Sequence, residues 1–324
     1  MKRGCAAQAV IVAKALAKIA ATAKAVVAAK AALAALVFCL AALFSCQSFG
    51  ASAEEYYAIG MAYFEIGKYG EAERWLFRAR SAGRTRVASD YNLGRIAYET
   101  GRYQDAAEYF ETVLDLDPDN VMALRALAYT RIKTGEIETA EALYARVLEL
   151  VPDNADDGYN HALVLYAMEK YDAAEELILS RYHALESSKD MLLLFARTQR
   201  ALGKVEAVDS YAQWLKDNSD NRVRYEYAQV LEGAELYARA LEEYQAALTD
   251  LPPDSTDPGA AEIRFSLARV YLAADAGNPQ GMTELKAAVE GGFADREALK
   301  ALALDERIGE ADRAEIQKLT ENLP

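Results

Sequence analysis

The amino-acid sequence predicts an all-α protein, a solenoid of about seven stacked helix pairs. A small residue recurs at Gly60, Gly94, Ala128, Ala162, Ala196, Ala228 and Ala268; the first four intervals are equal, the fifth is slightly shorter and the last is longer. Self-similarity at a period of about 34 residues is typical of stacked helical arrays. The hydrophobic content of 52% is enough for a continuous core along such an array.

Each repeat has the pattern of two antiparallel helices. In residues 53–86 the first helical face carries Tyr56, Ile59, Gly60 and Tyr63. Gly67 then ends the helix where the turn needs a residue without a Cβ atom. The second face carries Tyr69, Ala72, Leu76 and Ala79. Small residues such as Gly94 and Ala128 are expected where the two helices cross closely, because a larger side chain there costs roughly 1–3 kcal/mol by overpacking.

These residues resemble the tetratricopeptide repeat (TPR) pattern, in which a small residue follows Leu, Ala-x3-Phe comes later and a Pro closes the unit. The resemblance implies a right-handed solenoid. Six units are expected over residues 53–254, a linker loop over 255–260 and a divergent seventh unit over 261–294. Two capping helices are expected over 295–324. The match is weaker in the fourth unit, where Glu169 replaces the turn glycine.

The N-terminal segment 1–53 has the pattern of an export signal. It contains no Asp or Glu, and an apolar run covers positions 31–45. All acidic side chains follow this segment and outnumber the basic ones there, which makes residues 54–324 a poor surface for nucleic acid. The sequence leaves open whether positions 1–30 are an amphipathic leader or follow from a start site placed too early.

Three fates of this leader remain open. Leu43–Cys46 resembles a bacterial lipobox with Cys46 as the lipidated residue, although Phe44 fits that motif poorly. Ala51-Ser52-Ala53 is a good site for simple cleavage, and an uncleaved membrane anchor is the third possibility. The only cysteines are Cys5, Cys39 and Cys46, so the repeats offer no thiol chemistry. We expect an exported protein, periplasmic or at the outer membrane and lipid-anchored, with a cleaved soluble form as the alternative.

The TPR resemblance implies that the first helix of each unit lines a ligand groove. The groove positions of interest are Tyr57, Met61, Phe64, Tyr91, Arg95, Tyr98, Arg125, Tyr129, Tyr159, Tyr166, Arg197, Arg200, Tyr225 and Arg269. Tyr and Arg are the residues most enriched at binding hot spots. Packing between repeats is the alternative role for the aromatic side chains. The arginines would be costly in a core without partners, which favours a ligand with acidic or carboxylate groups.

The sequence predicts no enzyme, no cofactor and no metal site. It has no Gly-rich phosphate loop and no His-Glu-x-x-His motif. His161 falls on a packed helix face, which favours a hydrogen-bonded structural role. The chaperone-clamping TPR subclass is rejected because Tyr57 and Met61 stand where its Lys and Asn would be.

The predicted function is therefore a non-enzymatic scaffold of the bacterial cell envelope that binds a protein or peptide and reaches the membrane through its N-terminus. Two alternatives stay open: a periplasmic binder of small molecules that assists solute transport, and a surface adhesin. The sequence does not indicate the partner's identity, the membrane leaflet or the oligomeric state.

Overall fold

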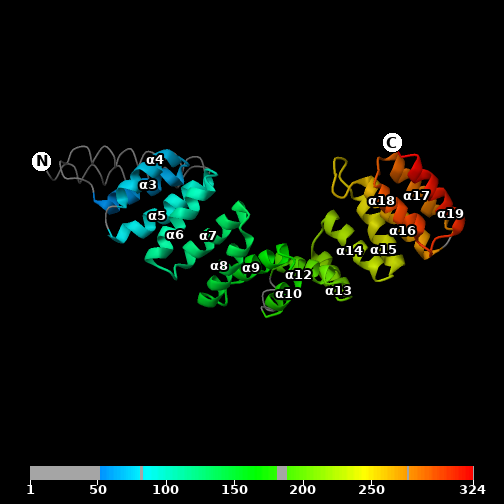
Figure 1. The fold of residues 1–324 in the computed structure, drawn as a ribbon, viewed down its shortest axis with the longest axis horizontal. Helices are drawn as coiled ribbons and strands as arrows, with labels where there is room; N and C mark the ends of the chain where they lie inside the picture. The colour runs from blue at the N-terminus through cyan, green and yellow to red at the C-terminus, as the bar shows by residue number, and fades with distance from the viewer. Residues whose placement is uncertain (1–51, 81–82, 181–187, 276, 324) are drawn as a thin grey trace, which may run out of the picture. The chain divides into compact units, whose positions relative to one another are not determined.

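A computed structural model describes residues 52–80, 83–180, 188–275 and 277–323. In these ranges the chain forms 16 α-helices arranged in pairs, which confirms the all-α solenoid of TPR type (Figure 1). The helices are α3 (Ala53–Glu65), α4 (Tyr69–Ala79), α5 (Gly83–Glu99), α6 (Tyr103–Leu116), α7 (Val121–Thr134), α8 (Ile137–Leu150), α9 (Ala155–Ala167), α10 (Tyr171–Leu179), α12 (Lys189–Ala201), α13 (Ala207–Asp217), α14 (Asn221–Gly233), α15 (Tyr237–Thr249), α16 (Ala260–Ala274), α17 (Pro279–Glu290), α18 (Arg296–Leu304) and α19 (Glu310–Glu321).

The predicted export signal and Cys46 lie outside the described residues. None of the described helices combines the length and the apolar character needed to cross a bilayer.

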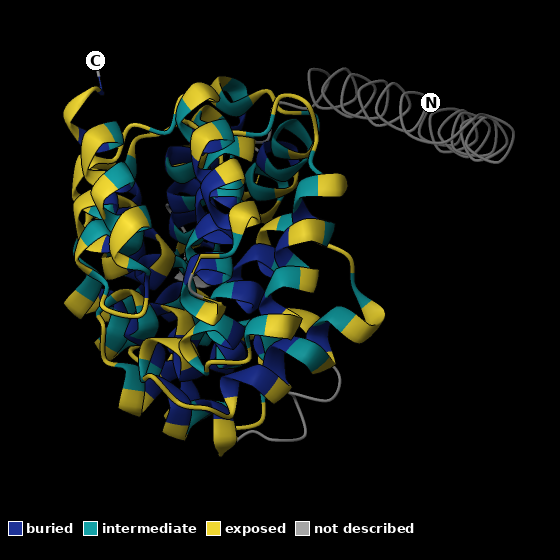
Figure 2. Cartoon of the chain, turned by 90° about the vertical axis from the view of Figure 1, so that its right-hand side faces the viewer, coloured by how far each residue is buried: buried dark blue, intermediate teal, exposed yellow. Residues whose placement is uncertain are grey.

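The chain divides into two compact units, one up to Val164 and one from Leu165. Buried positions lie on helix faces that point toward neighbouring helices, and exposed positions cover the outer faces (Figure 2). In the N-terminal unit one core cluster is built from Ala97, Ala106, Ala107, Phe110 and Leu127. In the C-terminal unit the largest fully buried side chains include Tyr211 and Tyr244. Within each unit, neighbouring helix pairs thus bury their apolar faces against one another.

The recurring small residues lie where the helices of a pair cross. A Cβ atom on Gly94 would stand 2.6 Å from a ring carbon of Phe110, and one on Gly60 would stand 2.7 Å from Cγ of Leu76. Phe110 follows Gly94 along the chain by the same interval as Leu76 follows Gly60, so a large side chain of the second helix reaches the first at a fixed spacing. The predicted steric role is confirmed at these two glycines. In the α16–α17 pair the arrangement is reversed, because Gly281 on the second helix meets Leu272 on the first.

The turns inside the pairs share one backbone geometry. Gly67, Gly101, Gly135 and Gly203 adopt positive φ angles between 68° and 83°. In the pairs α9–α10 and α14–α15 the same position is held by Glu169 and Glu235, with φ angles of 59° and 57°. The amide of Glu235 donates to the carbonyl of Glu232, and the amide of Leu236 donates to that of Leu231, as at the glycine turns. The hydrogen bonds therefore hold two glutamates in a conformation that glycine adopts at lower cost.

Replacing Glu169 or Glu235 by glycine is expected to raise the free energy of unfolding by about 0.5–1 kcal/mol each, because relief of left-handed strain exceeds the entropy cost of glycine. Guanidinium denaturation followed by Trp214 fluorescence measures the effect in the C-terminal unit. Gly203→Ala is the matched control and is expected to lower stability, since its φ is +68°. A lower free energy of unfolding in both Glu169→Gly and Glu235→Gly would contradict the proposed strain at these turns.

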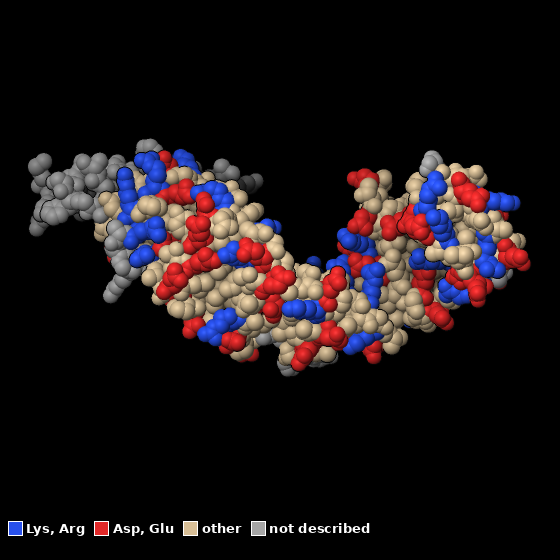
Figure 3. Space-filling view, viewed as in Figure 1, with Lys and Arg blue, Asp and Glu red and all other residues tan. Residues whose placement is uncertain are grey.

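Charge is not spread evenly over the surface. The whole chain carries a formal net charge of −14. Lys and Arg side chains are nevertheless frequent near α4 and the start of α5, among acidic ones, on the face shown in Figure 3. The basic side chains of this region thus come from α4 and the start of α5, whereas α3 contributes Glu54, Glu55 and Glu65.

Candidate functional site

A hollow of about 370 Å³ lies in the N-terminal unit on the first helices of three successive pairs. We call it the α5–α7 pocket. It is lined by Tyr91, Arg95, Tyr98 and Glu99 of α5, Phe110 of α6, Met122, Arg125, Ala126 and Tyr129 of α7, Tyr144 of α8 and Asn160 of α9. Five of the predicted groove residues are brought together here: Tyr91, Arg95, Tyr98, Arg125 and Tyr129.

Aromatic rings make up one wall of the pocket. The ring centroid of Tyr98 lies 5.3 Å from that of Tyr103 and 5.9 Å from that of Tyr129. Tyr129 stays 49% exposed, so much of its ring is available to a ligand. Burial raises the pKa of Tyr98 to about 12, with smaller contributions from Tyr129 and Tyr103. Its hydroxyl therefore stays protonated at neutral pH and can donate a hydrogen bond.

Arg95 supplies a positive charge at the edge of these rings. Its Nη1 donates to Oδ1 of Asn92 at 3.0 Å, and its guanidinium carbon lies 4.4 Å from the ring centroid of Phe64. Asn92 in turn donates from Nδ2 to the hydroxyl of Tyr57 at 3.1 Å. In the part of the chain that the structure describes, Arg95 forms no ion pair. Neutral neighbours orient this arginine, and Glu99, the one carboxylate among the described lining residues of the pocket, forms no ion pair with it.

Arg125, on the opposite helix of the pocket, has a carboxylate partner. Its Nε donates to Oδ1 of Asp157 at 2.7 Å, and its Nη2 donates to Oδ2. Asp157 is only 2% exposed, so this bidentate pair is largely removed from water. The hydrogen bond to Asp157 raises the pKa of Arg125, which burial alone would lower. Arg125 is therefore held in place by Asp157, and the pair links α7 to α9.

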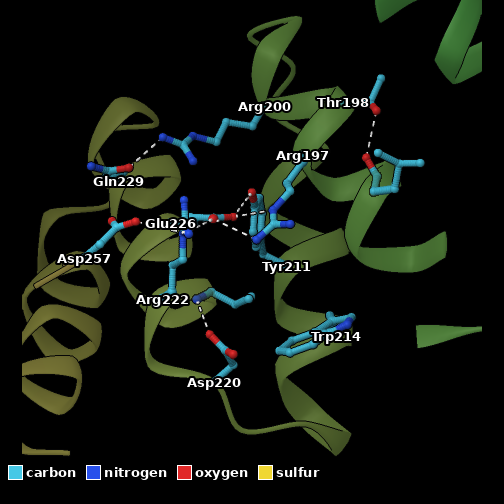
Figure 4. Close-up of polar contacts among 12 residues, drawn as sticks. Arg197, Thr198, Arg200, Tyr211, Trp214, Asp220, Arg222, Glu226, Gln229 and Asp257 are labelled. Carbon is cyan, nitrogen blue, oxygen red and sulfur yellow. Dashed lines mark hydrogen bonds and ion pairs between the residues drawn. The ribbon is translucent and has the colours of Figure 1, made fainter. Parts of the chain in front are cut away.

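The groove arginines of the C-terminal unit are tied to neighbouring repeats in the same way. Arg197 on α12 makes two hydrogen bonds of 2.9 Å to Glu226 on α14, which also accepts from the hydroxyl of Tyr211 at 3.0 Å (Figure 4). Arg200 donates to Oε1 of Gln229 at 2.7 Å. The carboxyl groups that the sequence analysis assigned to a ligand are thus supplied to Arg197 by the chain itself.

Arg269 on α16 makes the same kind of pair with Glu232 on α14. Its Nη2 donates to Oε2 of Glu232 at 2.7 Å, and its Nε donates to the other carboxylate oxygen. This pairing raises the pKa of Arg269 even though burial alone would lower it. The positive charge of Arg269 is compensated within the fold, as at Arg125 and Arg197.

The remaining predicted groove residues lie outside the α5–α7 pocket. Tyr57, Met61 and Phe64 of α3 are half-buried and pack against the cluster of Leu76, Leu93 and Ile96. Tyr159 and Tyr166 of α9 are also half-buried, and the ring of Tyr166 meets that of Tyr171 edge-on.

Tyr225 is 7% exposed, and its hydroxyl is 3.1 Å from both Oε1 of Glu262 and Oγ of Ser266. At Tyr225 the structure shows packing between repeats, the alternative role considered for these aromatic residues.

Four lining residues that are exposed or half-buried were absent from the predicted set: Glu99, Met122, Ala126 and Asn160. The predicted groove positions lie three before, one after and four after the small residue of each repeat. Each missed residue stands three or four positions from one of these on its own helix. Extending the helical face by such steps would have found all four.

In the part of the chain that the structure describes, no group of His, Cys, Asp and Glu side chains could hold a metal ion. His161 is 8% exposed, and its Nε2 lies 3.0 Å from Oε1 of Glu141, in agreement with the structural role expected for it. The interactions that the α5–α7 pocket offers are those of binding: aromatic contact, hydrogen bonding by a phenol and pairing with one arginine.

Comparison with known proteins agrees with this fold. Tetratricopeptide repeat models match residues 53–79 and 91–155, and the model named for anaphase-promoting complex, cyclosome, subunit 3 matches residues 133–211. No curated protein matches the chain.

Two solved structures show similar folds. A tetratricopeptide repeat protein from Parabacteroides merdae ATCC 43184 is 20% identical, with a TM-score of 0.54 over 83% of this chain and 99% of that one. YrrB, described as a TPR protein with an unusual peptide-binding site, is 20% identical, with a TM-score of 0.52 over 61% of this chain and all of that one. At this identity the likeness concerns the fold alone.

Proposed function

We propose that this chain, which is a tetratricopeptide repeat protein and an interaction scaffold, binds a peptide segment of a protein partner in the α5–α7 pocket. The observation that carries the proposal is that exposed Tyr129 lines the same pocket as Arg95, whose described contacts include no carboxylate. Aromatic rings contribute large contact area, and an arginine without a carboxylate partner beside them selects for negative charge.

The contacts of the arginines narrow the number of ligand carboxylates that the pocket can bind. Arg125, Arg197 and Arg269 are already paired with carboxylates, so the predicted row of ligand-binding arginines reduces to Arg95 in this pocket. We propose a peptide that lays one apolar or aromatic side chain against the exposed ring of Tyr129, which already contacts Tyr98. An acidic side chain or a C-terminal carboxylate of the same peptide would pair with Arg95.

Selection from a displayed random peptide library against the full chain tests this proposal. The selected peptides should share an apolar residue next to an acidic one. Tyr129→Ala and Arg95→Ala should each weaken their binding by about 10–100-fold, because each removes a contact worth about 1.5–3 kcal/mol. Phe77→Ala removes an exposed aromatic side chain of α4 and serves as the control, with no change expected. Equal affinities for all four proteins would rule out the α5–α7 pocket as the peptide site.

We also propose that the protein is exported and tethered to a membrane of the bacterial envelope through lipid on Cys46. The apolar run at positions 31–45 and the lipobox-like residues Leu43–Cys46 at its end support this location. Metabolic labelling with a fatty acid should mark the wild type and leave Cys46→Ser unlabelled. Label on both proteins, or on neither, would refute attachment at Cys46.

A further inference from the structure

A second surface, distinct from the pocket, lies on the outer side of α4. We call it the α4 surface and define it by Arg74, Trp75, Phe77 and Arg78. Phe77 is 59% exposed and is flanked by Arg74 and Arg78, both exposed. A hollow of about 550 Å³ opens beside Phe77, with Leu93 and Tyr109 among its other lining residues. The surface thus combines arginine side chains with an apolar floor.

Packing between repeats does not require an aromatic residue at the position of Phe77. The positions equivalent to Phe77 in the next two repeats are Glu111 and Ala145. The repeat pattern therefore does not require an exposed aromatic residue at position 77. Terminal repeats of a solenoid usually need a polar outer face to stay soluble. An aromatic group at that place indicates that the face contacts something apolar.

The arginines of the α4 surface lie against aromatic rings. The guanidinium carbon of Arg78 is 4.8 Å from the ring centroid of Trp75, and that of Arg80 is 5.1 Å from the ring centroid of Phe77. Arg74 pairs with Glu71 at 3.1 Å, but both side chains are well exposed, so that pair is weak and exchangeable. Aromatic rings with adjacent basic groups are enriched at the interface between lipid headgroups and acyl chains.

Charge complementarity favours an anionic partner. Residues 66–90 hold six Lys and Arg against three Asp and Glu, in a chain whose formal net charge is −14. The glutamates of α3 lie outside this segment. A membrane surface rich in anionic phospholipid attracts such a segment, at about 1 kcal/mol for each basic residue near it.

Position in the chain favours a bilayer over a peptide. The lipid proposed on Cys46 is carried seven residues before α3 begins at Ala53. Seven residues span at most about 25 Å when fully extended. A chain held by that lipid therefore keeps the start of α3 within that distance of the lipid headgroups.

We infer that the α4 surface docks on an anionic phospholipid bilayer, with Phe77 and Trp75 at the headgroup level and Arg74 and Arg78 on lipid phosphates. This inference rests on the membrane tether proposed above. It assigns the N-terminal helix pair to the membrane and leaves the α5–α7 pocket for the protein partner.

The two tryptophans of the chain provide the experiment. Trp75 lies on the α4 surface, whereas Trp214 is 7% exposed and lies in the C-terminal unit. Full-length chains with Trp214→Phe or Trp75→Phe each keep one reporter. Both are mixed with vesicles of phosphatidylcholine, with or without brominated phosphatidylglycerol, and recovered by flotation. Bromine quenches a tryptophan only at close contact with the lipid.

We expect quenching of Trp75 and none of Trp214 in the anionic vesicles, with loss of quenching at high salt. The double change Arg74→Glu/Arg78→Glu should lower the docking equilibrium constant by about 30-fold or more. Arg146→Glu, at the repeat position equivalent to Arg78 on α8, is the matched control and should have no effect. Co-flotation without quenching of Trp75 would overturn the docking inference while leaving the tether intact. Absence of co-flotation would overturn the docking inference, whereas the tether is decided separately by the fatty-acid label on Cys46. Equal quenching of both tryptophans would overturn the assignment of the contact to α4.

Discussion

Replacing Phe110 by alanine is expected to lower the free energy of unfolding of the N-terminal unit by about 3–5 kcal/mol. Phe110 is 1% exposed and fills the space next to Gly94, so its removal leaves a cavity that the rigid helix backbones cannot close. Because native domains are stable by only about 5–15 kcal/mol, this single change should unfold the unit at moderate temperature. Denaturation followed by the fluorescence of Trp75 measures it.

A double-mutant cycle identifies the cause. Gly94→Val alone should also destabilise the unit, since even a Cβ atom there would meet the ring of Phe110 at 2.6 Å. Combined with Phe110→Ala, the added methyl groups occupy the vacated space, so the double variant should lose less stability than the sum of the single changes. Strictly additive losses would contradict direct contact between these two positions. Tyr129→Ala, half-exposed on the next repeat, should change stability little and serves as the control.

Replacing Glu226 by leucine is expected to destabilise the C-terminal unit by about 2–4 kcal/mol. Glu226 is 8% exposed and accepts hydrogen bonds from Arg197 and from the fully buried hydroxyl of Tyr211. Its removal leaves a partly buried guanidinium and a buried phenol without their acceptor. The expected loss lies below that of a fully buried pair because the side chain of Arg197 stays 34% exposed. Trp214 fluorescence during denaturation reports the unit concerned.

The control for this change is an exposed ion pair. Arg146 contacts Glu149 at 2.5 Å, but its side chain is 45% exposed, so Arg146→Ala should cost the N-terminal unit at most about 1 kcal/mol, measured through Trp75 fluorescence. The double variant Arg197→Met/Glu226→Leu should recover part of the loss, because an apolar pair removes the orphaned charge. A loss after Glu226→Leu no greater than after Arg146→Ala would show that the pair between α12 and α14 does not hold the repeats together.

Much of the fold followed from the sequence because helix pairs repeat the same local contacts. Gly94 and Phe110 belong to one repeat, so the spacing that places them in contact is visible in the chain. The residue type at the turns was less regular than their backbone geometry. Glu235 adopts the left-handed conformation although nothing in its identity indicates it, because the two backbone hydrogen bonds of the turn impose that geometry on any residue.

The candidate site was predicted only in part. Tyr91, Arg95, Tyr98, Arg125 and Tyr129 do line one pocket, because all five follow the same face of α5 and α7. Tyr225 occupies the position equivalent to Tyr91 and is nevertheless buried beneath α16. Helical periodicity indicates which side of a helix a residue occupies. It does not indicate how closely the next repeat covers that side.

Local periodicity was sufficient to specify helix pairs, their crossing residues and the absence of familiar catalytic motifs, because each of these depends on residues within about one repeat. Whether each arginine is free to bind a ligand carboxylate depended on the folded chain. Arg125, Arg197 and Arg269 meet their carboxylates across 32, 29 and 37 residues, from helices of neighbouring repeats. A bidentate pair forms only when packing sets two helices at the right distance and angle. That packing leaves Arg95 as the arginine of the α5–α7 pocket with charge to offer a partner.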